Sequence, residues 1–293
     1  MVKELIDVVR QSAGVFMTAA AVLSAGLIGA GMLFTGLYGE TFRQTYGAPV
    51  SQKSATQEAG GYPQLSTYEE FPGLTRIPLL SEEEEALEAF EYSLTQKYPN
   101  LASEFIESLA DCYPGESLAG ENQEICFYLQ TDERCADKPF GEDPIGIYGC
   151  GPSAMAIVVS TLTELTIDPV RMAQWAYENG YWARQSGSYH TLIAGAAKAF
   201  SLDCESCPRE DTDAMRKALE EGSLIVVLMG KGQFTDSGHF IVLYGLTGEG
   251  KVLLADPNSM ERTNQEWDLE TITKEAKSYA ADGGPFWIIS RQQ

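Results

Sequence analysis

The residue best suited to chemistry is Cys150, in the stretch GIYGCGPSAMAIVVSTL over residues 146–162. Gly149 and Gly151 flank the cysteine and allow a ligand to approach the backbone closely. Pro152, which lacks a backbone N–H, suits the first turn of a helix. The pattern therefore predicts a cysteine at or next to a helix N-terminus, where partial positive charge favours the reactive thiolate. A small buried residue in a tight turn is the alternative, and this stretch alone leaves both open.

A cysteine nucleophile usually needs a base, and the chain has only two histidines, His190 and His239. His190 lies at the N-terminal end of a predicted helix, where an imidazolium ion is disfavoured, so we expect a surface or capping residue. His239 follows Gly238 and opens the apolar strand HFIVLYG. Because a polar ring at the mouth of a buried strand needs a hydrogen-bond partner, His239 is the predicted base.

Asp256 is the predicted partner of His239. The strands HFIVLYG and KVLLAD are joined by residues 246–250, which indicates a β-hairpin. A turn centred in this loop places His239 opposite Asp256 or Pro257, and directly opposed side chains have Cβ atoms about 4.5–5.5 Å apart. This geometry suits a carboxylate that orients an imidazole. The alternative is an aspartate that only begins the turn over residues 256–258.

Three stretches in this order resemble the C39-like branch of the papain-type cysteine peptidases: YGCGPSAMAIVVSTL, SGHFIVLYG and LLADPNS. The family has its Cys, His and Asp in the same order. The resemblance covers about residues 123–290 and includes the loop from Gln130 to Cys150, which matches a longer-loop subgroup. It implies that Gln130 is an oxyanion donor. Cys135 departs from the pattern, which has tryptophan there; we expect this to weaken packing and not chemistry.

The resemblance implies a cysteine peptidase that hydrolyses peptide bonds. Cys150 would attack the carbonyl, His239 would act as base and acid, Asp256 would orient His239, and Gln130 would hold the oxyanion together with the Cys150 N–H. A peptide or protein is the expected substrate, with no cofactor and no metal. Two alternatives stay open: a catalytically silent papain-like binding module that presents residues 81–112, and an acyl transferase that uses the same cysteine.

The elements that must position these residues are helices followed by antiparallel strands, which is an α+β order. Together with the resemblance, this order predicts a papain-like cysteine peptidase fold, with N-terminal helices packed on an antiparallel sheet. Helices are expected over residues 153–165, 168–178, 188–200 with Ser188 as cap, and 212–222. Strands are expected over residues 124–130, 223–229, 239–245, 251–256 and 285–290.

The start of the chain has a different character, because residues 11–39 contain no charged residue. About 20 apolar residues suffice to cross a bilayer, so we expect a transmembrane helix that anchors the chain in the cell membrane through residues 13–38. Lys3 and Arg10 precede this segment, which favours an extracellular catalytic domain. A cleaved signal peptide and a secreted protein are the alternative.

Changes in composition divide the rest of the chain. Residues 1–39 form the predicted anchor or signal segment, and residues 40–80, rich in Gly, Ser, Thr, Gln and Pro, a linker. Residues 81–122 form a small acidic helical region, with one helix from Ser81 and a second over residues 101–112. Residues 123–293 form the C39-like peptidase domain.

Charge and cysteine content narrow the function further. The chain has 20 Lys and Arg against 42 Asp and Glu, a net charge of −22, which argues against binding nucleic acid or anionic lipid. An extracellular location would permit disulfides. With Cys150 set aside the number of cysteines is odd, so at least one is unpaired. The pairing of the other five stays open: Cys112, Cys126, Cys135, Cys204 and Cys207.

Overall fold

A computed structural model describes residues 82–121 and 123–292. These residues belong to the second of two compact units, residues 80–293. The predicted membrane segment over residues 13–38, the linker and Ser81 lie outside the described residues. Among the residues that the structure describes, no helix combines the length and the apolar character needed to cross a bilayer.

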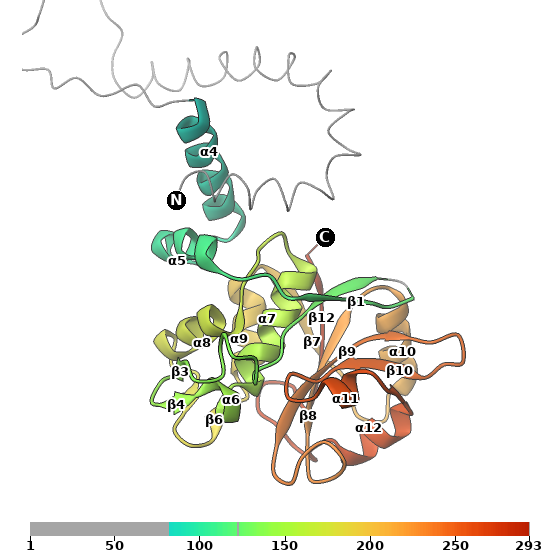
Figure 1. Ribbon diagram of the computed structural model, residues 1–293. Coiled ribbons are helices and arrows are strands. Elements are labelled where there is room, and N and C mark those ends of the chain that lie inside the picture. The colour runs from blue at the N-terminus through green and yellow to red at the C-terminus, as the bar shows by residue number, and fades with distance from the viewer. Residues whose placement is uncertain (1–81, 122, 293) are drawn as a thin grey trace, which may run out of the picture. The chain divides into compact units, whose positions relative to one another are not determined.

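A six-stranded antiparallel sheet forms the centre of the fold (Figure 1). Its strands follow the order β11 (Glu266–Trp267), β10 (Val252–Ala255), β9 (His239–Leu246), β8 (Leu224–Met229), β12 (Phe286–Arg291) and β7 (Leu202–Ser206). The antiparallel sheet expected from the sequence is confirmed. The strands predicted within residues 223–229, 239–245, 251–256 and 285–290 are β8, β9, β10 and β12.

Helices pack on both faces of this sheet. Leu224, Val226 and Leu228 of β8 belong to the core formed with α7 (Cys150–Leu162), α8 (Pro169–Glu178) and α9 (Leu192–Ala199). The alternate residues Ile225, Val227 and Met229 belong to a second core with α10 (Thr212–Glu220) and α12 (Leu269–Glu275). Because both faces of β8 are covered, its sequence is a continuous apolar run and does not alternate.

Short elements lead into the helix that carries Cys150. A hairpin of β1 (Glu116–Ala119) and β2 (Glu124–Phe127) precedes the hairpin of β3 (Pro139–Phe140) and β4 (Asp143–Pro144). The helix α6 (Ile145–Tyr148) follows at once, and a third hairpin, β5 (Trp182–Ala183) with β6 (Gly187–Ser188), lies between α8 and α9. The short helix α11 (Met260–Thr263) follows β10.

Two helix boundaries differ from the expected ones. The helix expected to begin at Ser153 begins at Cys150 itself, because Gly149 already occupies the N-cap position. Ser188, the expected cap of the third helix, lies in β6, and Thr191 is the N-cap of α9. The chain completes a hairpin before it turns into the helix, which local capping preferences do not reveal.

The acidic helical region packs on the rest of the described chain. It forms α4 (Glu82–Lys97), α5 (Ser103–Ser108) and the 3-10 turn η1 (Leu109–Asp111). The single helix expected over residues 101–112 is divided into α5 and η1. Tyr98 and Ile106 are buried in the same core as α7 and α9. The ring of Phe105 meets the ring of Phe200 edge-on, with centroids 6.1 Å apart. Buried side chains on both sides of the boundary predicted at residue 122 therefore share one core.

We predict that Ile106→Ala lowers the free energy of unfolding by about 2–5 kcal/mol, because the substitution leaves a cavity beneath α5. Glu107→Ala is the matched control, since Glu107 is exposed on the same helix, and it should change stability by less than about 0.5 kcal/mol. Urea denaturation of both variants measures the difference. Equal stability of the two variants would contradict a shared core.

Candidate active site

Cys150 is the first residue of α7, directly after the Gly149 N-cap. A side chain at Gly149 would collide with Ile145 of α6, and one at Gly151 would collide with the Ser188 hydroxyl. The two glycines therefore let α6, α7 and β6 approach closely around Cys150. The cysteine is half-buried, at a helix end whose first N–H groups have no partner within the helix.

His239 and Asp256 form the central polar pair of the site. His239 is the first residue of β9, and its Nε2 lies 2.6 Å from Oδ1 of Asp256. The two residues are 5% and 0% exposed. With Nε2 engaged by the carboxylate, Nδ1 is the ring nitrogen left to interact with the Cys150 sulfur, which is close enough to help raise the pKa of the ring.

A β-bulge brings His239 and Asp256 to the same face of the hairpin. Leu253 pairs with Gly245 but Leu254 pairs with Leu243, so Tyr244 is an extra residue in β9. Continued by one residue, this register sets Asp256 opposite Ile241, two residues from His239. The directly opposed pairing expected from the sequence is wrong, and the two residues meet on the diagonal. Without the bulge they would face opposite sides, since one residue of slip reverses the face.

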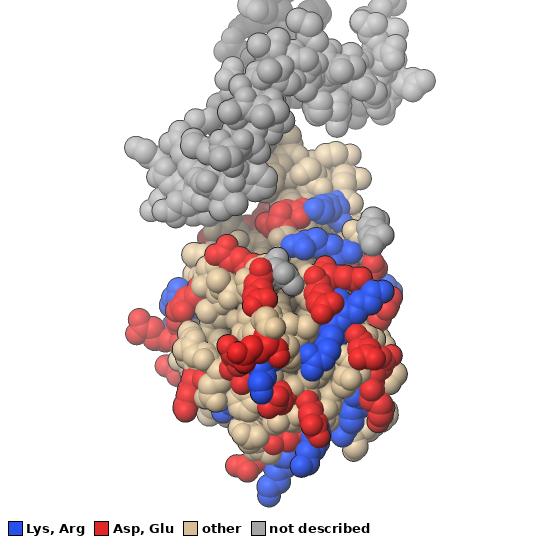
Figure 2. Space-filling model, turned by 90° about the vertical axis from the view of Figure 1, so that its right-hand side faces the viewer, with Lys and Arg blue, Asp and Glu red and all other residues tan. Residues whose placement is uncertain are grey.

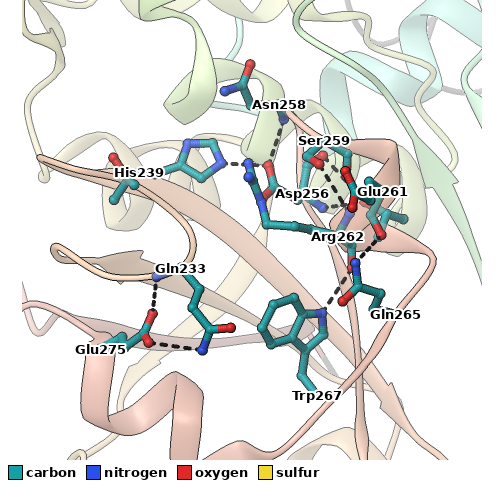
Figure 3. A network of polar contacts seen from close by, with 12 residues as sticks. Gln233, His239, Asp256, Asn258, Ser259, Glu261, Arg262, Gln265, Trp267 and Glu275 are labelled. Carbon is teal, nitrogen blue, oxygen red and sulfur yellow. Dashed lines mark hydrogen bonds and ion pairs between the residues drawn. The ribbon is translucent and has the colours of Figure 1, made fainter.

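The Asp256 carboxylate is held from three sides (Figure 3). Oδ1 also accepts a hydrogen bond from the Asn258 N–H at 2.8 Å, and Oδ2 accepts one from Nε of Arg262 at 2.5 Å. Ser259 caps α11 by accepting from the Arg262 N–H, which places the guanidinium beside the carboxylate. Sequence analysis missed Arg262; the serine followed three residues later by an arginine was the available signal.

The three ionisable groups Cys150, His239 and Asp256 stabilise one another in their charged forms. Burial alone would raise the pKa of the Cys150 thiol, but the hydrogen bond and positive charge of His239 lower it below its ordinary value. Burial opposes the charged form of His239 too, yet Asp256 and Cys150 raise the pKa of His239 to about 9. Against its own burial, the pKa of Asp256 is lowered by His239 and Arg262. The arrangement therefore favours a thiolate beside an imidazolium ion near neutral pH.

Gln130 lies against the same turn, and its side-chain amide donates to the segment before Cys150. It is 2% exposed, and its backbone N–H donates to the Pro257 carbonyl at 2.7 Å. Its side-chain Nε2 donates to the carbonyls of Ile145 at 3.3 Å and Gly146 at 3.1 Å. Within the described residues its Oε1 is buried without a hydrogen-bond partner. In this state, Gln130 links the Asp256 turn to the segment that precedes Cys150.

A pocket of about 350 Å³ opens beside the cysteine and histidine. Its lining consists of Cys150, Gln185, Ser186, Ser188, His190, Leu228, Ser237, Gly238, His239, Phe240 and Lys277. Asp143 positions the side of the pocket that contains Gln185. Its Oδ2 accepts hydrogen bonds from the Gln185 N–H at 2.6 Å and from Nε1 of Trp182 at 3.0 Å. The pocket gives a substrate direct access to Cys150.

His190 lines this pocket and is half-buried, whereas the sequence predicted a surface or capping residue. Its Nδ1 accepts a hydrogen bond from the Ala281 N–H at 3.5 Å. Burial and the nearby charge of Lys277 lower the pKa of His190, so it stays neutral near pH 7. Ser188 and Lys277 also line the pocket and were not singled out from sequence as site residues.

The other cysteines differ from Cys150. All six cysteines are free thiols in the described part of the chain. Burial raises the pKa of Cys112, Cys204 and Cys207 to about 11 in each case, which makes them poor nucleophiles. Over the same residues, no cluster of His, Cys, Asp and Glu is arranged to hold a metal ion.

Comparison with known proteins identifies the family. Residues 123–285, more than half of the chain, match the family model described as the Peptidase_C39 like family. The chain belongs to this C39-like peptidase family. The matched segment contains Gln130, Cys150, His239 and Asp256. Membership places the chain with cysteine peptidases at the level of the family, and the resemblance noted in its sequence is confirmed.

Other comparisons add little to the family assignment. No curated protein matches the chain. Among solved structures, the chain is similar to a crystal structure from Bacillus anthracis described as a candidate C39-like peptidase, with 14% identity and a TM-score of 0.33. That match covers 50% of this chain and 90% of the other. The mixed α and β architecture with antiparallel sheets is consistent with the C39-like peptidase fold.

We predict that Cys150 reacts with iodoacetamide at pH values where an ordinary thiol, with a pKa of about 8.5, is protonated. His239→Gln removes the positive charge that lowers the Cys150 pKa and leaves the burial that raises it. Alkylation at pH 7 should therefore fall at least ~10-fold in the variant and recover as pH rises, since each pKa unit is tenfold in thiolate. Mass spectrometry of the Cys150 peptide measures the rate, with Cys150→Ala as background. Identical pH profiles would contradict an ion pair.

Proposed function

We propose that this member of the C39-like peptidase family hydrolyses peptide bonds with Cys150 as nucleophile. The observation that supports this most is the buried His239–Asp256 hydrogen bond of 2.6 Å next to a cysteine at a helix N-terminus. A purely structural cysteine needs neither an imidazole nor a buried carboxylate beside it. The pocket that reaches Cys150 has room for substrate groups at the reacting atoms.

The proposed reaction has two steps. The Cys150 thiolate attacks the substrate carbonyl, and Nδ1 of His239 gives its proton to the leaving amine as the C–N bond breaks. Neutral His239 then takes a proton from water, which attacks the thioester and releases the acid and the thiolate. Asp256 holds the ring through Nε2, so the same nitrogen faces the sulfur in both steps.

Oxyanion stabilisation is the role we propose for Gln130 and the Cys150 N–H. Backbone N–H groups at a helix N-terminus are free to donate to a developing negative charge. The Gln130 amide now donates to Ile145 and Gly146, so it has to turn towards the substrate to take part. Its buried, unpartnered Oε1 lowers the cost of that rotation, because no hydrogen bond at that atom is lost.

We further propose that the chain is a membrane-anchored enzyme with an extracellular peptidase domain. Support comes from the charge-free residues 11–39 and from Lys3 and Arg10 before them. The division into an anchor at 1–39, a linker at 40–80, a helical region at 81–122 and a catalytic domain at 123–293 belongs to this proposal. Its substrate would be a peptide or protein.

The decisive experiment follows hydrolysis of a peptide library by the full chain and by Cys150→Ala. We expect the variant to lose hydrolysis by roughly 10³-fold or more, since removal of a nucleophile abolishes covalent catalysis. Cys204→Ala is the matched control and should retain activity, because that thiol has a pKa of about 11. Added amine separates hydrolysis from acyl transfer by its products. Activity that survives in Cys150→Ala would overturn the proposal, and an inactive parent chain would favour a binding module.

A second prediction isolates the oxyanion role of Gln130. Gln130→Ala should lower kcat by about 100-fold, the effect of losing one oxyanion donor. It should leave Cys150 alkylation by iodoacetamide within about 2-fold, because that displacement forms no oxyanion. Parallel loss of both rates would instead indicate that Gln130 only supports the loop before Cys150.

A further inference from the structure

The pocket beside Cys150 contrasts with the acidity of the chain. Asp and Glu outnumber Lys and Arg by 42 to 20, and Figure 2 shows acidic side chains spread over one face with basic ones between them. Among the described residues that line the pocket, however, there is no carboxylate, and Lys277 is the one Lys or Arg. The pocket lining is therefore positively charged when Lys277 is protonated, whereas the chain as a whole is negatively charged.

Backbone contacts hold Lys277 in place. The Lys277 N–H donates to the Leu228 carbonyl at 2.9 Å, beside the bridge between Met229 and Ala276 that continues the pairing of β8 past the end of β12. Arg209 donates from Nη2 to the Ala276 carbonyl at 2.9 Å and to the Lys277 carbonyl at 2.5 Å. The position of the lysine is thus set by main-chain hydrogen bonds, which leave its ammonium group to face the pocket.

The ammonium group of Lys277 lies beside the residue that precedes His239, and it is close enough to His190 to lower the pKa of that ring. A Cβ placed on Gly238, the residue before His239, would be 3.4 Å from Nζ of Lys277. Within residues 82–121 and 123–292, Lys277 forms no ion pair, although six other Lys and Arg residues pair with Asp or Glu on the surface. A cation in the same pocket as Cys150 and His239 that has no carboxylate partner in the described residues can accept one from a ligand.

Neutral donors complete the pocket. Ser188 is 9% exposed, and its Oγ is buried without a hydrogen-bond partner in the described residues. This hydroxyl lies against Gly151, next to Cys150. Ser188 therefore adds a neutral residue to the lining and no negative charge that would compete with a ligand for Lys277.

We infer that the pocket binds a carboxylate of the substrate through Lys277, which makes acidic residues beside the scissile bond the preferred substrate class. This inference rests on the proposed peptidase function. The carboxylate is either an Asp or Glu side chain or the α-carboxylate at a chain end, and both have the same chemistry. Lys277 is then a specificity-determining residue that contacts the substrate and leaves the bond-breaking steps to Cys150 and His239.

The first experiment compares matched peptides on the full chain. Substrates that carry Glu or Gln at each position around the cleaved bond, and free-acid or amide ends, separate the two sources of carboxylate. We expect kcat/KM to favour the carboxylate peptide by about 10-fold at one position, an effect of a close charge pair that salt weakens. Lys277→Ala should remove the preference, Lys277→Arg should keep it, and Lys277→Glu should reverse it towards Lys peptides.

The second experiment needs no peptidase activity. Iodoacetate and iodoacetamide alkylate Cys150 by the same displacement, but only iodoacetate carries a carboxylate. The ratio of their rates should fall about 5-fold in Lys277→Ala and further in Lys277→Glu, because the attraction to the ammonium is lost. Lys274→Glu is the matched control, since Lys274 is exposed on α12 and does not line the pocket.

The two experiments distinguish the inference from the proposed function. A ratio that changes in Lys277→Ala and not in Lys274→Glu supports the carboxylate site even if no peptide is cleaved, an outcome that would count against the peptidase alone. A ratio within about 2-fold of the parent in both Lys277 variants would overturn the site. An equal fall in Lys274→Glu would overturn it as well, because it would show a general effect of surface charge.

Discussion

The site depends on one buried charge, the carboxylate of Asp256. A fully buried carboxylate is stable only when positive or hydrogen-bonding groups surround it. His239, Arg262 and the Asn258 N–H supply these groups. The hydrogen bond from Nε2 to Asp256 fixes the orientation of the His239 ring. Nδ1 is therefore the nitrogen left to interact with Cys150, and the positive charge of the ring stabilises the Cys150 thiolate.

The central sheet and the helix α7 give this charge pair its place. Apolar cores cover both faces of β8. The adjacent strand β9 is therefore part of a well-packed sheet, and its first residue, His239, lies at the end of that sheet. The core also contains Tyr98 and Ile106 from the helical region before the family segment. The geometry of the candidate site and the stability of α4 and α5 are therefore linked through shared packing.

Substrate choice involves a balance between long-range and local electrostatics. A net charge of −22 repels acidic peptides at a distance, while Lys277 and the donors around it favour a carboxylate within the pocket. Local charges in a partly desolvated pocket are screened less than exposed ones. Selectivity for acidic substrates can thus coexist with a surface that is acidic overall.

The sequence alone determined the motifs, the apolar strands and the family, because glycines around a cysteine, a histidine before a buried strand and an aspartate after the next are local patterns. It also predicted that Asp256 partners His239, but through direct opposition. Only the tertiary structure decided that a bulge at Tyr244 brings them together diagonally, that Arg262 completes the site, and that Lys277 and Ser188 enter the pocket. The pocket contacts join segments distant in sequence, and the diagonal pairing depends on a one-residue shift of register, so neither leaves a local pattern to read. The Arg262 contact is local, and its signal was the serine that precedes it by three residues.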